Sequence, residues 1–285
     1  MVFVRRILGG LCLVAAAVCW AERDRQSAPS ELRIVTYNIL ADDDRAAQRV
    51  PRLLAILKDA NADIIVLQEV TPWFGARLLK ESWVQDYHRP LQDGKTLIAH
   101  EFLILARFPI AAFETAPLPG KQHRAFFSVT IRTPGGTVRV ATCHLESLLE
   151  DGPTRAEQLD VYFQRLGGDD DVFLAGDFNF GDGEQPDTAH IGKSFHDAWR
   201  EVFPNKPGFT WDIKQSLMAK EGSFPHEPSR RLDRVLYRSA TWSPVAVELL
   251  GTEPVSAKNR RIFPSDHFGL LAVFRAKEGA APAVR

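Results

Sequence analysis

The sequence is poor in cysteine and has no surplus of positive charge. Of its three cysteines, Cys12 and Cys19 lie within the first 21 residues, and Cys143 is the only one after them. A lone thiol excludes an internal disulfide, so the fold has to be held by its hydrophobic core. The 35 Lys and Arg residues are balanced by 36 Asp and Glu residues. This balance excludes a global basic field that attracts nucleic acid non-specifically, so any polyanion binding has to be local.

Several motifs of well-known catalytic sites are also missing. The chain has no zinc-type Cys/His spacing, no Walker phosphate-binding loop and no Gly-x-Ser-x-Gly nucleophile elbow. We therefore expect no covalent serine or cysteine intermediate, and we assign Cys143 to packing. At 285 residues with 45% hydrophobic content, the chain is long enough for one large, well-packed domain.

The first 21 residues differ in character from the rest. Arg5 and Arg6 precede an apolar run from Ile7 to about Trp20, which is short for a membrane span and typical of a signal peptide. We predict that residues 1–21 are a signal peptide, with an N-terminal membrane anchor as the alternative. The protein is then exported, either periplasmic or secreted, or else anchored to the membrane. Residues 22–31 are predicted to be a polar linker and residues 32–285 a single catalytic domain.

Segments of strand and helix character alternate along this domain. Buried strands are predicted around 32–40, 63–70, 101–110 and 171–179, a hairpin over 125–147, and later strands at 231–238, 243–250 and 269–274. Helical spacing predicts helices at 45–59, 153–166 and 195–203, and Pro51 suggests a kink or a late start in the first. About nine strands and three or four helices in one unit indicate a layered α/β (α+β) fold.

Polar side chains accompany six of these hydrophobic strands. They are Asn38, Glu69, His144, Asp177 with Asn179, Asp233, and Asp266 with His267. Each one alone is more often a turn former or an ordinary core residue. Six together favour a site built from strand ends, in which oxygen ligands hold a hard cation such as Mg²⁺ or Mn²⁺. The two histidines suit acid–base or phosphate-stabilising roles.

The motifs "TYNIL", "LQEV", "CHLES", "GDFN", "RLDRVLY" and "SDH" occur in this order. The ordered set resembles the endonuclease/exonuclease/phosphatase superfamily over about residues 32–275. Arg155 after "CHLES", together with "DAWREV", "FTWD" and "RIFPSDHFGLL", is similar to the tyrosyl-DNA phosphodiesterase 2 catalytic domain. Tyr37 and Gly181 depart from that branch, which has Trp and Arg there, and residues 93–107 match it poorly. The resemblance implies two packed mixed β-sheets flanked by helices, a four-layer α/β/β/α sandwich.

The resemblance also implies roles for the polar residues. The expected metal ligands are Glu69, Asn38 and Asp266, with Mg²⁺ or Mn²⁺ as the cofactor. The expected catalytic residues are Asp177 for the attacking water, Asn179, His144 and His267 for the phosphate, and Asp233 for orienting His267. The expected substrate-binding residues are Arg155, Trp211 and Arg231.

The chemistry so implied is attack of water on a phosphoester. The first expectation is a phosphodiesterase or nuclease acting on nucleic acid, which includes 5′-end processing of the tyrosyl-DNA phosphodiesterase 2 kind. An exported phosphatase or a sphingomyelinase-like phosphodiesterase is the alternative, and a non-catalytic binding module is opposed by the complete polar set. The expected partner is the phosphoester substrate; no stable protein partner is implied, and a monomer is expected.

Overall fold

The computed structural model describes residues 30–43, 45–168 and 171–277. The predicted signal peptide or anchor, residues 1–21, and most of the predicted linker lie outside these residues. Within the described part of the chain, no helix combines the length and apolarity needed to cross a membrane.

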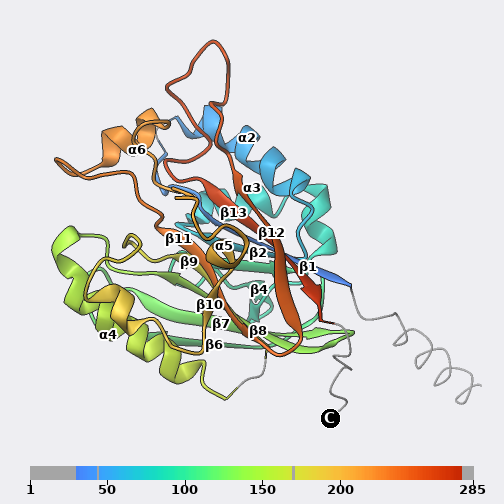
Figure 1. Ribbon diagram of the computed structural model, residues 1–285. Helices are drawn as coiled ribbons and strands as arrows, with labels where there is room; N and C mark the ends of the chain where they lie inside the picture. Colours follow the sequence, from blue (N-terminus) through green and yellow to red (C-terminus); the bar gives the residue numbers. More distant parts are fainter. Residues whose placement is uncertain (1–29, 44, 169–170, 278–285) are drawn as a thin grey trace, which may run out of the picture.

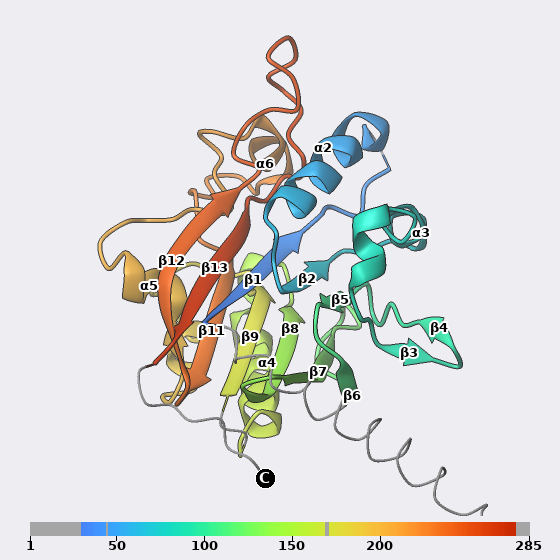
Figure 2. The ribbon, with the colours of Figure 1, turned by 90° about the vertical axis from the view of Figure 1, so that its right-hand side faces the viewer.

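Two large β-sheets form the centre of the molecule (Figures 1 and 2). The five-stranded sheet has the order β12-β13-β1-β2-β5, with β12 Trp242–Leu250, β13 Gly269–Ala276, β1 Glu31–Asn38, β2 Ile64–Gln68 and β5 Leu103–Ala106. The six-stranded sheet has the order β10-β11-β9-β8-β7-β6, with β10 His196–Asp197, β11 Asp233–Ser239, β9 Asp171–Asp177, β8 Gly136–His144, β7 Ala125–Thr133 and β6 Ile110–Pro117. A separate hairpin pairs β3 Leu91–Gln92 with β4 Lys95–Thr96.

Helices cover the outer faces of both sheets. They are α2 Ala46–Asp59, α3 Pro72–Leu78 and α4 Gly152–Arg165. Two short helices lie elsewhere: α5 Ala198–Val202 adds Ala198 and Trp199 to the core between the sheets, and α6 Leu217–Gly222 packs through Met218 on the segment before β13. Helices α2 and α3 lie over the five-stranded sheet and α4 over the six-stranded sheet (Figure 2). The predicted four-layer α/β/β/α sandwich is therefore confirmed.

The alternation of side chains along a strand explains the layers. In β1, Ile34 packs between the two sheets and Val35 packs against the helical layer. In β2, Val66 packs between the two sheets and Leu67 packs against the helical layer. Since successive side chains point to opposite faces, a strand covered on both faces reads as a continuous apolar run. This is why these strands were readable in the sequence.

Other elements departed from the prediction. Helix α2 begins at Ala46 and continues through Pro51, so the suggested late start is wrong. The described residues contain thirteen strands instead of about nine. The unpredicted ones are the edge strand β6, which is largely exposed, and the two-residue strands β3, β4 and β10. Short or exposed strands carry too few buried positions to produce a clear pattern.

Strand pairing brings the polar strand ends to one edge of the sandwich. β1 and β2 run parallel, with Asn38 opposite Gln68, the residue before Glu69. β8 and β9 also run parallel, with His144 opposite Asp177. β11 is antiparallel to β9, so its first residue, Asp233, stands opposite Asp177. The carboxyl ends of four strands and the start of β11 therefore meet.

Candidate active site

The six-stranded sheet contributes a row of three ionisable side chains. His144, Asp177 and Asp233 occupy directly opposed positions on the neighbouring strands β8, β9 and β11. All three are buried. Asp177 Oδ1 accepts a hydrogen bond of 2.9 Å from the Asn179 backbone N–H, whereas Oδ2 faces the other sheet.

The five-stranded sheet contributes Asn38 and Glu69. Asn38 Nδ2 donates to Glu69 Oε1 at 2.9 Å and to Asp177 Oδ2 at 3.0 Å, so this amide joins the two sheets at the site. Glu69 has a left-handed backbone with φ of 60°, an uncommon conformation for a residue with a side chain. Its Oε2 accepts from the Ala41 N–H at 2.7 Å, which fixes the carboxylate. Strain of this kind is concentrated at functional positions.

His267 completes the convergence from the segment that leads into β13. Its Nδ1 lies 2.8 Å from Asp233 Oδ2, and its Nε2 lies 3.7 Å from Asp177 Oδ2. Burial lowers the pKa of His267, but the charges of Asp233 and Asp177 outweigh it and raise the pKa well above its ordinary value. Burial opposes the ionisation of Asp177, but the charge of His267 and the hydrogen bonds from Asn38 and Asn179 hold the pKa of Asp177 below its usual range. His267 is therefore a cationic donor beside an ionised carboxylate.

His144 has the opposite character. Burial and the adjacent Arg124 guanidinium lower the pKa of His144 to about 3, so the imidazole is neutral at physiological pH. Its Nε2 lies 3.6 Å from Asp177 Oδ2 and 3.9 Å from Glu69 Oε1, but a neutral ring makes no ion pair at those separations. The Arg124 guanidinium nitrogens lie 2.9 and 3.1 Å from the two ring nitrogens. Two histidines in one site thus hold different protonation states.

These side chains surround a pocket of about 220 Å³. The predicted residues that line it are Glu69, His144, Asp177, Asn179, Trp211, Asp266 and His267, and Asn38 and Asp233 contact its walls through hydrogen bonds. Sequence reasoning missed Arg124 and Phe224, which also line it. Arg124 lies directly before the buried strand β7, where one Arg carries no recognisable signal.

Two of the predicted substrate-binding residues lie elsewhere. Arg155 is buried in an ion pair of 2.6 Å with Asp187, and its Nη1 donates to the backbone carbonyls of Glu146 and Leu148. Arg231 is buried against Asp182 and Asp197. The pocket is lined instead by Arg230, which pairs with Glu227. The geometry gives Arg155 and Arg231 structural roles, because their guanidinium groups form buried ion pairs away from the pocket.

Trp211, in contrast, lines the pocket. Its ring centroid is 4.9 Å from that of His267, and it pairs through an isolated β-bridge with Arg230. The indole lines the pocket and packs against Gly222 at the end of α6. The packing is close, since a Cβ added at Gly222 would lie 3.1 Å from the indole ring.

The donor set fits a divalent cation. Burial raises the pKa of Glu69, and the charge of Asp266 raises it further, so two carboxylates repel each other across the pocket. A cation between them would relieve that repulsion, and oxygen donors are what Mg²⁺ prefers. Single atoms of Asp177, Asp233 and His267 also lie within 4.8 Å of one another. We favour Glu69 and Asp266, since a cationic imidazole cannot ligate a metal. Asn38, predicted as a third ligand, would support the ion indirectly, because its Nδ2 donates to Glu69 and its Oδ1 accepts from the Leu40 N–H.

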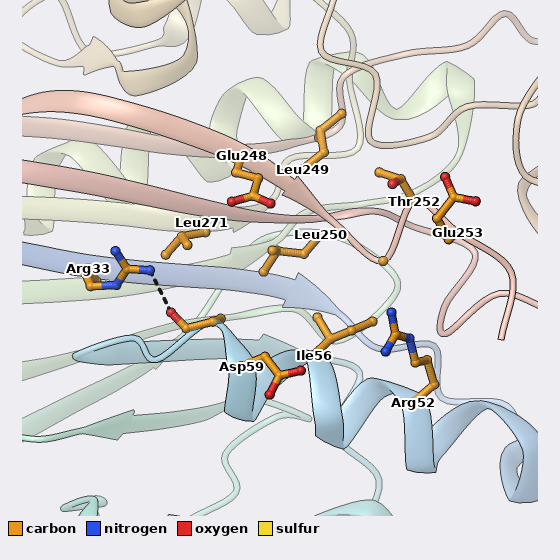
Figure 3. Close-up of a pocket in the computed structure, with 12 residues that line it drawn as sticks. Arg33, Arg52, Ile56, Asp59, Glu248, Leu249, Leu250, Thr252, Glu253 and Leu271 are labelled. Carbon is orange, nitrogen blue, oxygen red and sulfur yellow. Dashed lines mark hydrogen bonds between the residues drawn. The ribbon is translucent and has the colours of Figure 1, made fainter.

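A larger cavity of about 300 Å³ lies away from this chemistry (Figure 3). It is bounded by the end of α2 and by β12, with Arg52, Asp59 and Glu248 among its side chains. None of the converging residues lines it. Volume alone therefore does not identify the site.

A four-layer sandwich with this site at one edge defines a class of phosphoester hydrolases. The model of the endonuclease/exonuclease/phosphatase family matches residues 35–267, and the chain belongs to that family. It is accordingly an enzyme of the phosphodiesterase/hydrolase kind.

Sequence relatives of the chain include tyrosyl-DNA phosphodiesterases 2. The chain is 28% identical to that of Rattus norvegicus over 252 residues, covering 85% of this chain and 66% of the relative. It is 27% identical to that of Homo sapiens over 263 residues, covering 88% and 70%. The chain thus spans about two thirds of the length of these relatives.

Solved structures agree on the fold. The Danio rerio enzyme of that name, complexed with single-strand DNA product, has a TM-score of 0.73 and 25% identity, covering 87% of this chain and all of the other. The truncated Caenorhabditis elegans enzyme has a TM-score of 0.70 at 23% identity, with 86% of this chain and 98% of the other covered. The human nocturnin catalytic domain, at 19% identity and a TM-score of 0.65, covers 87% and 95% and shows the fold alone.

Proposed function

We propose that this protein is a Mg²⁺- or Mn²⁺-dependent phosphodiesterase that hydrolyses nucleic acid, with 5′-end processing as its specific activity. The observation that carries the proposal is the arrangement of Asp177 between two histidines of opposite protonation state. An ionised carboxylate beside a cationic imidazole supplies both a proton acceptor and a phosphate-stabilising donor in one pocket.

In the proposed mechanism, Asp177 orients the attacking water and accepts its proton. The Asn179 side chain donates one N–H to the Leu145 carbonyl at 2.9 Å, which leaves its second N–H for a phosphate oxygen. His267 donates Nε2–H to another phosphate oxygen as negative charge develops, while Asp233 holds the ring direction through Nδ1. Neutral His144, at the end of β8, and Arg124, directly before β7, line the same pocket.

Glu69 and Asp266 would hold the divalent cation, with Asn38 fixing the Glu69 carboxylate through its Nδ2. When bound, such an ion neutralises phosphate charge and stabilises the leaving oxygen. The chain's own contribution is to fix these donors at the sheet edge.

Nucleic acid is the proposed substrate because similarity and pocket composition agree. The relatives' names specify tyrosyl-DNA, and the Danio rerio structure contains single-strand DNA product. Trp211 and Phe224 offer aromatic surface beside the phosphate site, which suits a base or an aromatic leaving group. Export directed by residues 1–21 and a monomeric state remain part of the proposal.

A metal-dependent substrate panel tests the function. Purified protein with Mg²⁺ should hydrolyse 5′-tyrosyl single-stranded DNA in preference to plain DNA, RNA, sphingomyelin and inositol phosphates. The matched control is His267→Ala, which should lose turnover and keep its unfolding transition. Preference for sphingomyelin or an inositol phosphate would replace the nucleic-acid assignment with the alternative, and inactivity on every phosphoester would end the proposal.

A further inference from the structure

The connection between β12 and β13 projects beyond the sandwich at the same end as α6 and the start of α2 (Figures 1 and 2). Its tip carries Lys258, Arg260 and Arg261, all exposed. The tip is an ordered turn, because Asn259 N–H donates to the Ser256 carbonyl at 3.1 Å and a β-bridge joins the same two residues. This places three cations on one defined protrusion.

Only one of the three cations on this protrusion, Arg261, forms an ion pair within the described residues. Glu221 of α6 pairs with Arg261 at 2.8 Å and with Arg45 at 3.2 Å. In the described part of the chain, Lys258 and Arg260 take part in no ion pair. With a whole-chain net charge of −1, these two side chains supply local positive charge that the global balance lacks.

Helix α6 connects the protrusion to the pocket. The Phe263 N–H donates to Met218 Sδ at 3.2 Å, and both residues share one small apolar cluster. At the other end of α6, Gly222 and then Phe224 line the catalytic pocket. The protrusion is therefore packed on the element that forms one rim of the active site.

Phe224 is unusual among the pocket residues because it is exposed. Its exposed fraction is 39%, whereas Trp211 in the same pocket is buried at 7%. Exposure costs an aromatic side chain its apolar stabilisation unless a ligand covers it. A nucleobase is such a ligand, because each base offers a flat face for stacking.

We propose that Phe224, Lys258 and Arg260 form an exit surface for single-stranded nucleic acid leaving the catalytic pocket. Phe224 stacks on a base beside the scissile phosphate, and the two cations bind phosphates further along the strand. The inference rests on the proposed function, and it adds a binding surface outside the pocket. Arg260 precedes Asp266 by six positions, so the chain holds them within about 20 Å. A decanucleotide covers that distance at about 3.4 Å per nucleotide.

The test measures binding apart from turnover. Fluorescence anisotropy with labelled deca-thymidylate, in EDTA, is compared between the parent, Lys258→Gln/Arg260→Gln and Phe224→Ala. Each phosphate contact on a single strand contributes about 0.7 to the slope of log K against log salt, so losing two lowers it by about 1.4. At 0.1 M salt this corresponds to roughly 25-fold weaker binding. Phe224→Ala should weaken binding about 10-fold with an unchanged slope, since stacking releases no counterions.

Matched controls remove similar groups from other surfaces. Lys58→Gln/Lys95→Gln removes two exposed cations from α2 and β4, and Phe113→Ala removes an exposed ring from β6. Both should bind deca-thymidylate as the parent does. Hydrolysis of bis(p-nitrophenyl) phosphate, which is too small to reach the protrusion, should stay within about twofold in Lys258→Gln/Arg260→Gln.

The outcomes separate this inference from the proposed function. Unchanged affinity and slope in Lys258→Gln/Arg260→Gln overturn the exit surface, even if the parent cleaves nucleic acid. Parental hydrolysis of bis(p-nitrophenyl) phosphate without deca-thymidylate binding overturns both the surface and the nucleic-acid substrate. Vesicles containing phosphatidylserine form the last arm, because an exposed ring and two exposed cations on one end of the molecule also suit anionic lipid. Vesicle binding in place of oligonucleotide binding refutes the inference.

Discussion

Replacing Asp233 with Asn should show how much catalysis depends on the orientation and charge of His267 while His267 itself is kept. Asp233 Oδ2 lies 2.8 Å from His267 Nδ1, and both side chains are buried. The substitution keeps the shape but removes the charge that most strongly raises the pKa of His267 against the effect of burial. It also offers the ring an amide that can act as a donor, which disfavours the required tautomer. A buried hydrogen bond to a charged group contributes about 1.5–3 kcal/mol.

We therefore expect the turnover of Asp233→Asn to fall by about 10²–10³, or roughly 2.7–4.1 kcal/mol at 1.36 kcal/mol per tenfold. Because His267 acts as a cation, a lower pKa moves the alkaline limb of the pH–rate profile to lower pH. The assay is steady-state hydrolysis of an aryl phosphodiester across pH. Asp187→Asn is the matched control, since it changes a buried ion pair outside the pocket and should cost stability without moving the profile. If the alkaline limb of the pH–rate profile stays in place in Asp233→Asn, Asp233 does not raise the pKa of a catalytic His267.

Three further predictions concern the cation, acid stability and a buried arginine. Glu69→Gln should reduce turnover about 10²–10³-fold and raise the Mg²⁺ concentration needed for half-maximal activity, which a metal titration measures; an unchanged titration would exclude Glu69 as a ligand. The pKa of His144 in the folded protein, about 3, lies below its ordinary value, so below about pH 6.5 the unfolded state binds more protons than the folded state. The free energy of unfolding therefore decreases as the pH is lowered. Urea unfolding should show a loss of about 2 kcal/mol between pH 7 and 4.5, which His144→Gln removes; equal losses in both proteins would contradict the assignment. Arg155→Ala should lower the free energy of unfolding by about 3–5 kcal/mol, because it leaves Asp187 buried and unpaired. Normal stability with weakened substrate binding would restore the predicted substrate role.

The layers and the converging strand ends could be predicted from the sequence because strong patterns encode them. Strands covered on both faces form apolar runs, and a polar side chain at the end of such a run stands out. Asn38, Asp177 and His267 were recognisable for this reason. The pairing that places Asp177 between His144 and Asp233 follows from the sheet order, which only the structure supplies.

The arginines were less predictable because their side chains are long. Arg230 and Arg231 are neighbours, yet Arg230 lines the pocket and Arg231 is buried against Asp182. Adjacent residues in an extended segment point to opposite sides, so an error of one residue exchanges a pocket role for a structural one. Arg124 carried no motif, and its position became meaningful only once β7 had placed it beside His144.

The central claim is that one metal-dependent site at the sheet edge hydrolyses phosphodiesters. Release of p-nitrophenol from the p-nitrophenyl ester of thymidine 5′-monophosphate tests it most directly, measured first in EDTA and then after excess Mg²⁺ is added. We predict no release in EDTA, restoration by Mg²⁺, and no restoration in Asp177→Ala. Release that persists in EDTA, or that survives in Asp177→Ala, would contradict it.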